Sequence, residues 1–190
     1  MKYQTILLFG APGCGKGTQG KILGQIPGFF LLSCGDVFRG LDSRSKLGQI
    51  FLEYSSKGEL VPDEFTVQLW QNHVDALVQA KRFSPDRDIL VLDGIPRNLN
   101  QAKIMSDRLC VTRLFHLDCP DRAKLVERLK RRALRENRLD DANEATIRHR
   151  IEVYEAETVS VLGFYDKDLV AVIDGTRSPL DVARAVLARL

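Results

Sequence analysis

The glycine-rich segment GAPGCGKGTQ (10–19) constrains the fold of this chain more than any other feature. It follows the apolar run TILLF (5–9), which is typical of a buried strand, and it opens a helical stretch. A strand, a glycine-rich turn and a helix in this order form a Walker A unit, whose backbone N–H groups face phosphate oxygens. Lys16 would reach the β- and γ-phosphates, and the helix N-terminus adds positive potential. The segment therefore predicts a phosphate site at the end of the first strand.

Further apolar runs recur along the chain, with helical patterns between them. They are FFLL (29–32), ILVL (89–92), RLFHL (113–117) and LVAVI (169–173). Because they lack polar alternation, they are typical of strands that are covered on both faces. The clearest helical pattern spans 144–165, where residues that would form one buried helix face recur at steps of three and four. Strands that alternate with helices predict an α/β fold with a five-stranded parallel sheet, whose ligands lie beyond the carboxyl ends of the strands.

Composition argues against several classes of protein. The net charge is only +3, and the basic surplus is concentrated in residues 121–150. Such a local excess, without interleaved aromatic residues, argues against nucleic-acid binding. No apolar stretch is long enough to span a membrane, and the N-terminal run is too short for a signal peptide. The four cysteines have no metal-binding spacing, so we expect no structural zinc and a reducing, cytoplasmic location.

Six short segments, taken together, resemble the adenylate kinase family of nucleoside monophosphate kinases. They occur in the family's order and are GAPGCGKGTQ (10–19), SCGDVFR (33–39), GELVP (58–62), DGIPRNLNQ (93–101), NRLDD (137–141) and DGTRSP (174–179). The resemblance covers nearly the whole chain and implies one kinase domain of the short-lid form. Its parts would be a core (1–32, 63–131 and 139–190), a helical NMP-binding insertion (about 33–62) and a short lid (about 132–138). The implied reaction moves the γ-phosphoryl group of MgATP to AMP and gives two ADP, reversibly.

The resemblance also assigns a role to individual residues. ATP would bind Gly13, Cys14, Gly15, Lys16, Gly17, Thr18, Arg128, Arg132 and Arg177. AMP would bind Cys34, Arg39, Glu59, Leu60, Val61, Gly94, Ile95, Pro96, Arg97, Gln101, Arg138 and Arg150. The catalytic residues would be Lys16, Asp93, Arg132, Arg138 and Arg150, and Asp93 would hold Mg²⁺ through water. We expect a monomer whose partners are ATP, AMP and ADP, with neither a nucleic acid nor a membrane among them.

Phosphoryl transfer explains why these residue types are needed. Catalysis rests on positioning and on stabilising charge, and water must be excluded from the site. Arg39 and Arg97 could each grip the acceptor phosphate through two parallel hydrogen bonds. A lid would explain the arginines between 128 and 138, since they would close together over a transition state that carries several negative charges. We expect Asp140 and Asp141 to pair with these arginines and orient them.

Three departures from the family pattern leave alternatives open. Cys34 stands where the family has threonine, and Ile95 stands where it has an aromatic residue. A UMP/CMP kinase on the same scaffold is therefore the second interpretation. One extra residue between Asp141 and Arg150 leaves Arg148 or Arg150 as the catalytic arginine, and the apolar residue that follows Arg150 favours the latter. A non-catalytic nucleotide-binding regulatory module is less favoured, because it has no need of arginines at the γ-phosphate.

The preferred acceptor base is predicted to be adenine. Gln101 lies four residues after Arg97, so one segment could grip the phosphate and read the base. The amide offers a donor and an acceptor side by side, which matches the adenine edge. In the family, a backbone carbonyl from the stretch near Val61 accepts from the adenine amino group. Uracil or guanine would place a carbonyl oxygen against that acceptor.

Overall fold

The strands form one parallel sheet in the part of the chain that the computed structural model describes, residues 2–136, 138, 141 and 143–190. They are β1 (Tyr3–Phe9), β2 (Phe29–Ser33), β3 (Ile89–Asp93), β4 (Leu109–Asp118) and β5 (Val170–Asp174), in the order β2-β3-β1-β4-β5. The predicted five-stranded α/β fold is confirmed. Each predicted run coincides with a strand, although β4 begins earlier, at Leu109 instead of Arg113.

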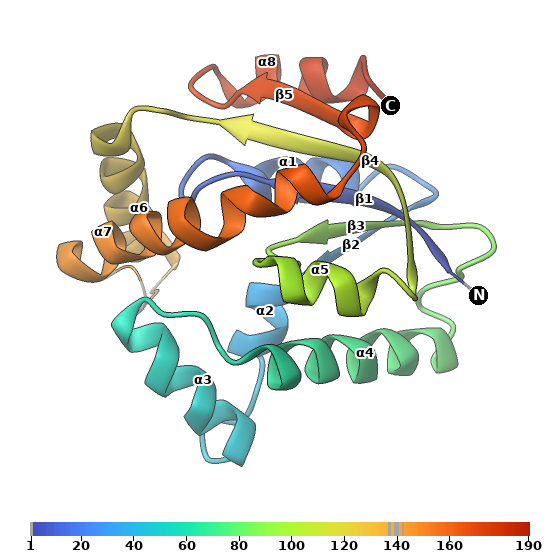
Figure 1. The fold of residues 1–190 in the computed structure, drawn as a ribbon, viewed down its shortest axis with the longest axis horizontal. Helices are drawn as coiled ribbons and strands as arrows, with labels where there is room; N and C mark the ends of the chain where they lie inside the picture. The colour runs from blue at the N-terminus through green and yellow to red at the C-terminus, as the bar shows by residue number, and fades with distance from the viewer. Residues whose placement is uncertain (1, 137, 139–140, 142) are drawn as a thin grey trace.

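Helices pack on both faces of this sheet (Figure 1). They are α1 (Lys16–Leu23), α2 (Cys34–Arg39), α3 (Lys46–Lys57), α4 (Asp63–Gln79), α5 (Leu99–Met105), α6 (Arg122–Glu136), α7 (Glu144–Val153) and α8 (Pro179–Leu187). Leu90 and Leu92 of β3 belong to one buried cluster, whereas Val91 between them belongs to the other. Successive strand residues point to opposite faces, so this division explains why the strand runs show no polar alternation.

The helical pattern at 144–165 does not form one continuous α-helix. α7 ends at Val153 and is followed by a π-helical turn, Tyr154–Thr158, and a 3₁₀ segment, Val159–Phe164. Ile147, Ile151 and Val161 are nevertheless buried, as the pattern predicts. Apolar spacing reports which side of a helix faces the core, and it is insensitive to a local change in the width of a turn.

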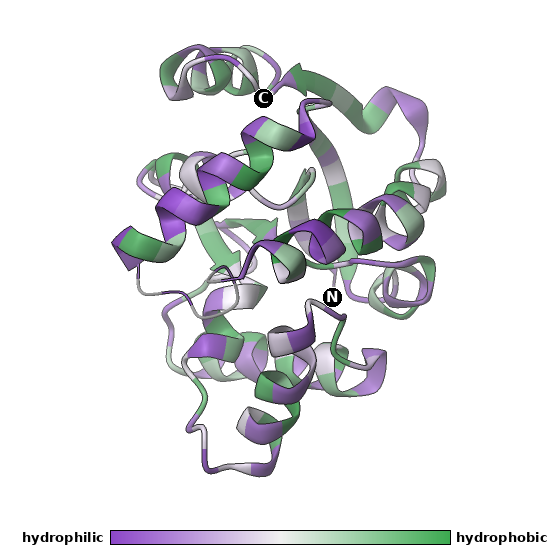
Figure 2. Ribbon diagram, turned by 90° about the vertical axis from the view of Figure 1, so that its left-hand side faces the viewer, coloured by the Kyte–Doolittle hydropathy of each residue, from purple (hydrophilic) through white to green (hydrophobic). Residues whose placement is uncertain are grey.

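The carboxyl ends of the strands are flanked by two helical layers. In Figure 1 the strand arrows point toward α6 and α7, and α2 and α3 lie below them. Figure 2 shows that the helices alternate between hydrophobic and hydrophilic residues, as expected when one side of each helix packs against the core. Among the described residues, none of the helices is both long enough and apolar enough to cross a membrane.

Candidate active site

The loop between β1 and α1 has the shape that the Walker A pattern predicts. Gly10 and Gly15 have backbone φ angles of 141° and 108°, which residues other than glycine rarely adopt. A Cβ on Gly10 would also lie 2.5 Å from the carbonyl oxygen of Leu117. Lys16 Nζ donates to the carbonyl oxygens of Gly10 (2.6 Å) and Ala11 (3.1 Å). The loop therefore holds the ammonium group of Lys16 close to its own backbone.

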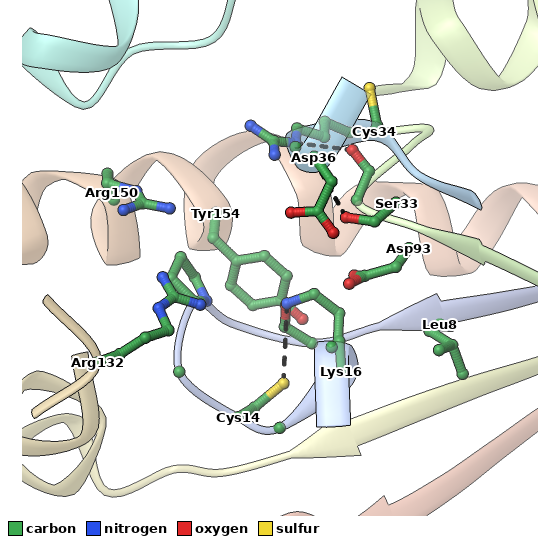
Figure 3. Close-up of a pocket in the computed structure, with 18 of the residues that line it drawn as sticks. Leu8, Cys14, Lys16, Ser33, Cys34, Asp36, Asp93, Arg132, Arg150 and Tyr154 are labelled. Carbon is green, nitrogen blue, oxygen red and sulfur yellow. Dashed lines mark hydrogen bonds between the residues drawn. The ribbon is translucent and has the colours of Figure 1, made fainter. Parts of the chain in front are cut away.

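A cavity of about 690 Å³ opens from this loop across the carboxyl ends of β1, β2 and β3 (Figure 3). Its volume lies in the usual range for small-molecule sites, about 300–1,000 Å³. Among the predicted site residues it is lined by Gly13, Cys14, Gly15, Lys16, Gly17, Thr18, Cys34, Arg39, Glu59, Leu60, Val61, Asp93, Gly94, Pro96, Arg97, Gln101, Arg128, Arg132, Arg138, Arg150 and Arg177. The structure thus brings residues from all six segments together at one site.

Ile95 is the predicted site residue that does not line the cavity. Its side chain is 1% exposed and belongs to the buried cluster that contains Leu92 and Met105. An apolar side chain gains more from burial in this cluster than from exposure beside charged groups. The predicted role of Ile95 in AMP binding stays a prediction, whereas its neighbours Gly94 and Pro96 do line the cavity.

Asp93 is the last residue of β3, and its side chain lies in the cavity near Lys16 of the phosphate loop (Figure 3). Burial raises the pKa of its carboxyl group, and the charges of Lys16 and Arg97 act in the opposite direction. A Cβ on Gly17 would lie 3.6 Å from Asp93 Oδ2, so the start of α1 approaches this carboxylate closely. Among the described residues, no three His, Cys, Asp or Glu side chains gather into a metal-binding group.

Asp141 is the centre of the arginine cluster. Its side chain is fully buried, and Oδ2 accepts a hydrogen bond of 2.7 Å from Arg132 Nε. Oδ1 accepts from Arg150 Nη1, so one carboxylate orients arginines from α6 and from α7. The predicted pairing of Asp141 with lid arginines is confirmed. The predicted partner Asp140 lies outside the described residues.

The arginines of this cluster lie close enough to repel one another. Burial is the main cause that lowers the pKa of Arg132, and the charges of Arg138 and Arg150 lower it further, whereas Asp141 raises it. Arg138 Nε donates to Glu136 (2.6 Å), and its Nη2 lies 4.0 Å from Asp36 Oδ1. A bound polyanion would relieve this repulsion, so the cluster is suited to phosphate groups.

The model of the adenylate kinase family matches residues 8–170 of the chain. This chain belongs to the adenylate kinase family. It is 36% identical to an adenylate kinase from Thermobifida fusca, over 97% of each chain. It is also 36% identical to one from Thermus thermophilus, over 98% of this chain and 97% of the relative. The resemblance inferred from the six segments is confirmed, and so is the prediction of an enzyme that acts as an ATP:AMP phosphotransferase; the alternatives are not favoured.

Membership of the family does not say whether Arg148 or Arg150 is the catalytic arginine, but their surroundings in the structure differ. Arg150 lines the cavity and pairs with Asp141. Arg148 is exposed and pairs with Glu144 through Nε (3.0 Å) and Nη2 (2.7 Å), on the same helix. Arg150 therefore has the position that a catalytic arginine of an adenylate kinase would need.

Arg128 contacts backbone oxygens of two loops that line the cavity. Its Nη1 donates to the carbonyl oxygens of Gly175 (2.9 Å) and Gly13 (3.5 Å), and its Nη2 donates to that of Thr176 (3.4 Å). These contacts join the phosphate loop to the loop that contains Arg177. Arg128 thus acts structurally in the described conformation, and its contact with ATP stays a prediction.

The segments 33–39 and 93–101 bring two arginines and a buried thiol to the cavity. Arg97 Nε donates to the carbonyl oxygen of Gly94 (2.9 Å), and Arg39 Nη2 pairs with Asp36 (2.5 Å). Burial raises the pKa of Cys34 to about 11, so its thiol stays protonated and can donate. The family's threonine would offer a stronger donor at this position.

Tyr154 is one of the polar residues at the cavity that sequence reasoning missed. Tyr154 lines it beside Lys16, and its hydroxyl lies 3.1 Å from His116 Nε2 (Figure 3). The helical pattern suggests a core residue at this position, and Tyr154 is in fact partly buried at the start of the π-helical turn. Asp63 was also missed: it does not line the cavity, but its carboxylate accepts hydrogen bonds from three side-chain amides of the segment 98–101.

Proposed function

We propose that this enzyme binds MgATP and AMP in one cavity, transfers the γ-phosphoryl group to AMP, and releases two ADP in a reversible reaction. The observation that carries the proposal is that one cavity is lined by three groups suited to phosphate. They are the phosphate loop with Lys16, the arginines Arg39 and Arg97, and the arginines Arg132 and Arg150 that Asp141 holds.

Each group has a role in positioning or in charge stabilisation. The backbone N–H groups of the loop and Lys16 would hold the ATP phosphates, while Arg39 and Arg97 would hold the phosphate of AMP. Arg132, Arg138 and Arg150 would surround the γ-phosphoryl group while it is transferred. Because Asp141 holds Arg132 and Arg150 before substrate arrives, little reorganisation is needed when charge develops.

Asp93 fits a role in holding Mg²⁺ through water. It contributes one carboxylate beside Gly17 and the phosphate loop, which suits an ion that keeps several waters and binds substrate phosphates. When bound, the ion would neutralise part of the phosphate charge. The lining residues Gly17 and Thr18 open α1 at this point, so the carboxylate and the helix start face the same phosphates.

Segments 33–62 and 132–138 are proposed to close over the substrates and exclude water. Two contacts already cross between the layers. Thr146 Oγ1 of α7 lies 3.4 Å from the carbonyl oxygen of Ser56 in α3, and Arg138 lies close to Asp36 of α2. Closure would bring the arginines over the acceptor and prevent transfer to water. We also propose that the enzyme is a monomer and that it acts in the cytoplasm, where free cysteines such as the four of this chain stay reduced.

A bisubstrate mimic tests whether two nucleotides bind end to end. Two adenosines joined through five phosphates should bind at least about 100-fold more tightly than ATP, because both sites are filled while association entropy is lost once. Calorimetric titration would measure the affinities. A matched compound with three phosphates is too short to reach both ends and should lose this advantage. Affinity of the longer compound no better than that of ATP would remove the two-site model.

Acceptor preference tests the assignment of the base. The specificity constant for AMP should exceed those for UMP and GMP by roughly 10- to 100-fold, since an unmatched buried polar group costs about 1–3 kcal/mol. The carbonyl oxygen of Val61 already accepts from Thr66 Oγ1 (3.2 Å), which fixes its direction. CMP keeps an amino group and should be rejected less strongly. A coupled assay with ATP and each acceptor measures this order, and a higher value for UMP or CMP would support the second interpretation.

A further inference from the structure

Asp63, the first residue of α4, gathers three side-chain amides. Its Oδ1 accepts from Asn98 Nδ2 (2.8 Å) and from Gln101 Nε2 (2.8 Å), and its Oδ2 accepts from Asn100 Nδ2 (2.7 Å). Burial opposes ionisation, but the hydrogen bonds from Asn100, Asn98 and Gln101 outweigh it and lower the pKa of Asp63. The carboxylate is therefore ionised at neutral pH and acts only as an acceptor.

The opposite side of the Gln101 amide is held by a group that can only donate. Gln101 Oε1 accepts from the backbone N–H of Arg97 (2.8 Å), and the residue is 1% exposed. A flipped amide would place its NH₂ group against the N–H of Arg97 and its oxygen against the carboxylate of Asp63. Both contacts would then be repulsive, so the amide has one orientation.

The backbone of Gln101 is held as firmly as its side chain. Asn98 caps α5, and its Oδ1 accepts from the backbone N–H of Gln101 (2.9 Å). Asp63 lies directly after the segment 58–62, so its carboxylate joins the end of the insertion to the segment that grips phosphate. The amide of Gln101 therefore keeps its position relative to Val61 and Arg97.

An amide in a fixed orientation distinguishes two bases that have the same shape. Adenine presents an amino donor at C6 beside an acceptor at N1, whereas hypoxanthine presents an oxygen acceptor at C6 beside an N1–H donor. Gln101 lines the cavity, and its amide keeps one further N–H and one further lone pair for a ligand. One orientation of the amide can match only one of these bases.

We propose that Asp63 is a positioning residue that determines acceptor specificity, by fixing the Gln101 amide in the orientation that accepts adenine and rejects hypoxanthine. The proposal rests on the proposed function, in which AMP occupies the acceptor site. Asp63 acts through Gln101 and need not touch the nucleotide.

The test is the substitution Asp63→Ala, assayed with ATP and either AMP or IMP. Without the carboxylate the amide can turn, so the ratio of the specificity constants for AMP and IMP should fall about tenfold. The change should lie mainly in KM, because base recognition is remote from the transferred group. Glu64→Ala is the matched control, since Glu64 also lies in the first turn of α4 but is exposed, and the three amides bond to Asp63 instead. Its ratio should equal that of the parent.

A second measurement follows the side-chain amide of Gln101 directly and does not depend on catalysis. The side-chain NH₂ of Gln101 should exchange slowly with solvent in the parent and in Glu64→Ala, and faster in Asp63→Ala, as followed by nitrogen-15 NMR. If Asp63→Ala folds poorly, the volume-conserving Asp63→Asn replaces it and should give a smaller change in the same direction. An unchanged ratio, or an amide as protected without Asp63 as with it, would overturn the proposal. A parent enzyme that fails to use AMP would instead overturn the proposed function, and the NMR result would still decide whether Asp63 holds the amide.

Discussion

The substitution Lys16→Ala should lower the turnover number by about 10²- to 10³-fold while the protein stays folded. Lys16 is the cation of the phosphate loop, and its ammonium group is held at the carbonyl oxygens of Gly10 and Ala11. Removing one preorganised donor from a charge-stabilising site has an effect of this size on the rate. Stability should change little, because Lys16 is only partly buried and lines an open cavity in which water can reach the two carbonyl groups.

A coupled assay for ADP and a thermal unfolding curve would separate these effects. Lys103→Ala is the control, since Lys103 is an exposed lysine of a helix, α5, and does not line the cavity. It should retain the parental rate. If Lys16→Ala also keeps the parental rate and melting temperature, the loop does not bind phosphate as proposed. A loss of rate together with unfolding would leave the loop's role in structure as the better explanation.

The sheet was predictable because its strands are buried on both faces. Runs such as ILVL (89–92) have no other simple interpretation when helical patterns and turn residues separate them. The position of the cavity beyond the carboxyl ends of the strands then follows from the ligand position usual for parallel sheets. The π-helical turn at Tyr154 was not predictable in the same way, since apolar spacing is nearly the same in both kinds of helix.

The site was predictable where one short segment carries the chemistry. The glycines around Lys16 belong to one short segment, and Asp93 and Arg97 belong to another. These residues line the cavity. Features that depend on distant partners were missed. Asp63 and Gln101 lie 38 residues apart in the chain, so their hydrogen bond leaves no local signal. The burial of the Ile95 side chain also depends on distant partners, because the core that it meets decides the direction of that side chain.

The substitution Arg150→Ala should reduce the turnover number by about 10²- to 10³-fold, whereas Arg148→Ala should change it by less than about twofold. Both arginines belong to α7, but Arg150 lines the cavity and pairs with the buried Asp141. Arg148 makes an exposed ion pair with Glu144, and such pairs contribute about 0–1 kcal/mol to stability and nothing to the reaction. Steady-state rates of the two variants would therefore decide which arginine is catalytic.

Arg150→Ala also removes one of two cations from a buried carboxylate, so a loss of stability could imitate a loss of catalysis. Breaking a buried ion pair costs about 3–5 kcal/mol, and Arg132 remains to compensate part of the charge of Asp141. Arg150→Lys separates the two effects, because lysine restores a cation beside Asp141 but lacks the planar fork that binds phosphate. We expect its melting temperature to lie close to that of the parent and its turnover number to remain low. If Arg150→Lys recovers the parental rate, Arg150 contributes charge to Asp141 alone, and the contact with the transferred group belongs to Arg132 or Arg138.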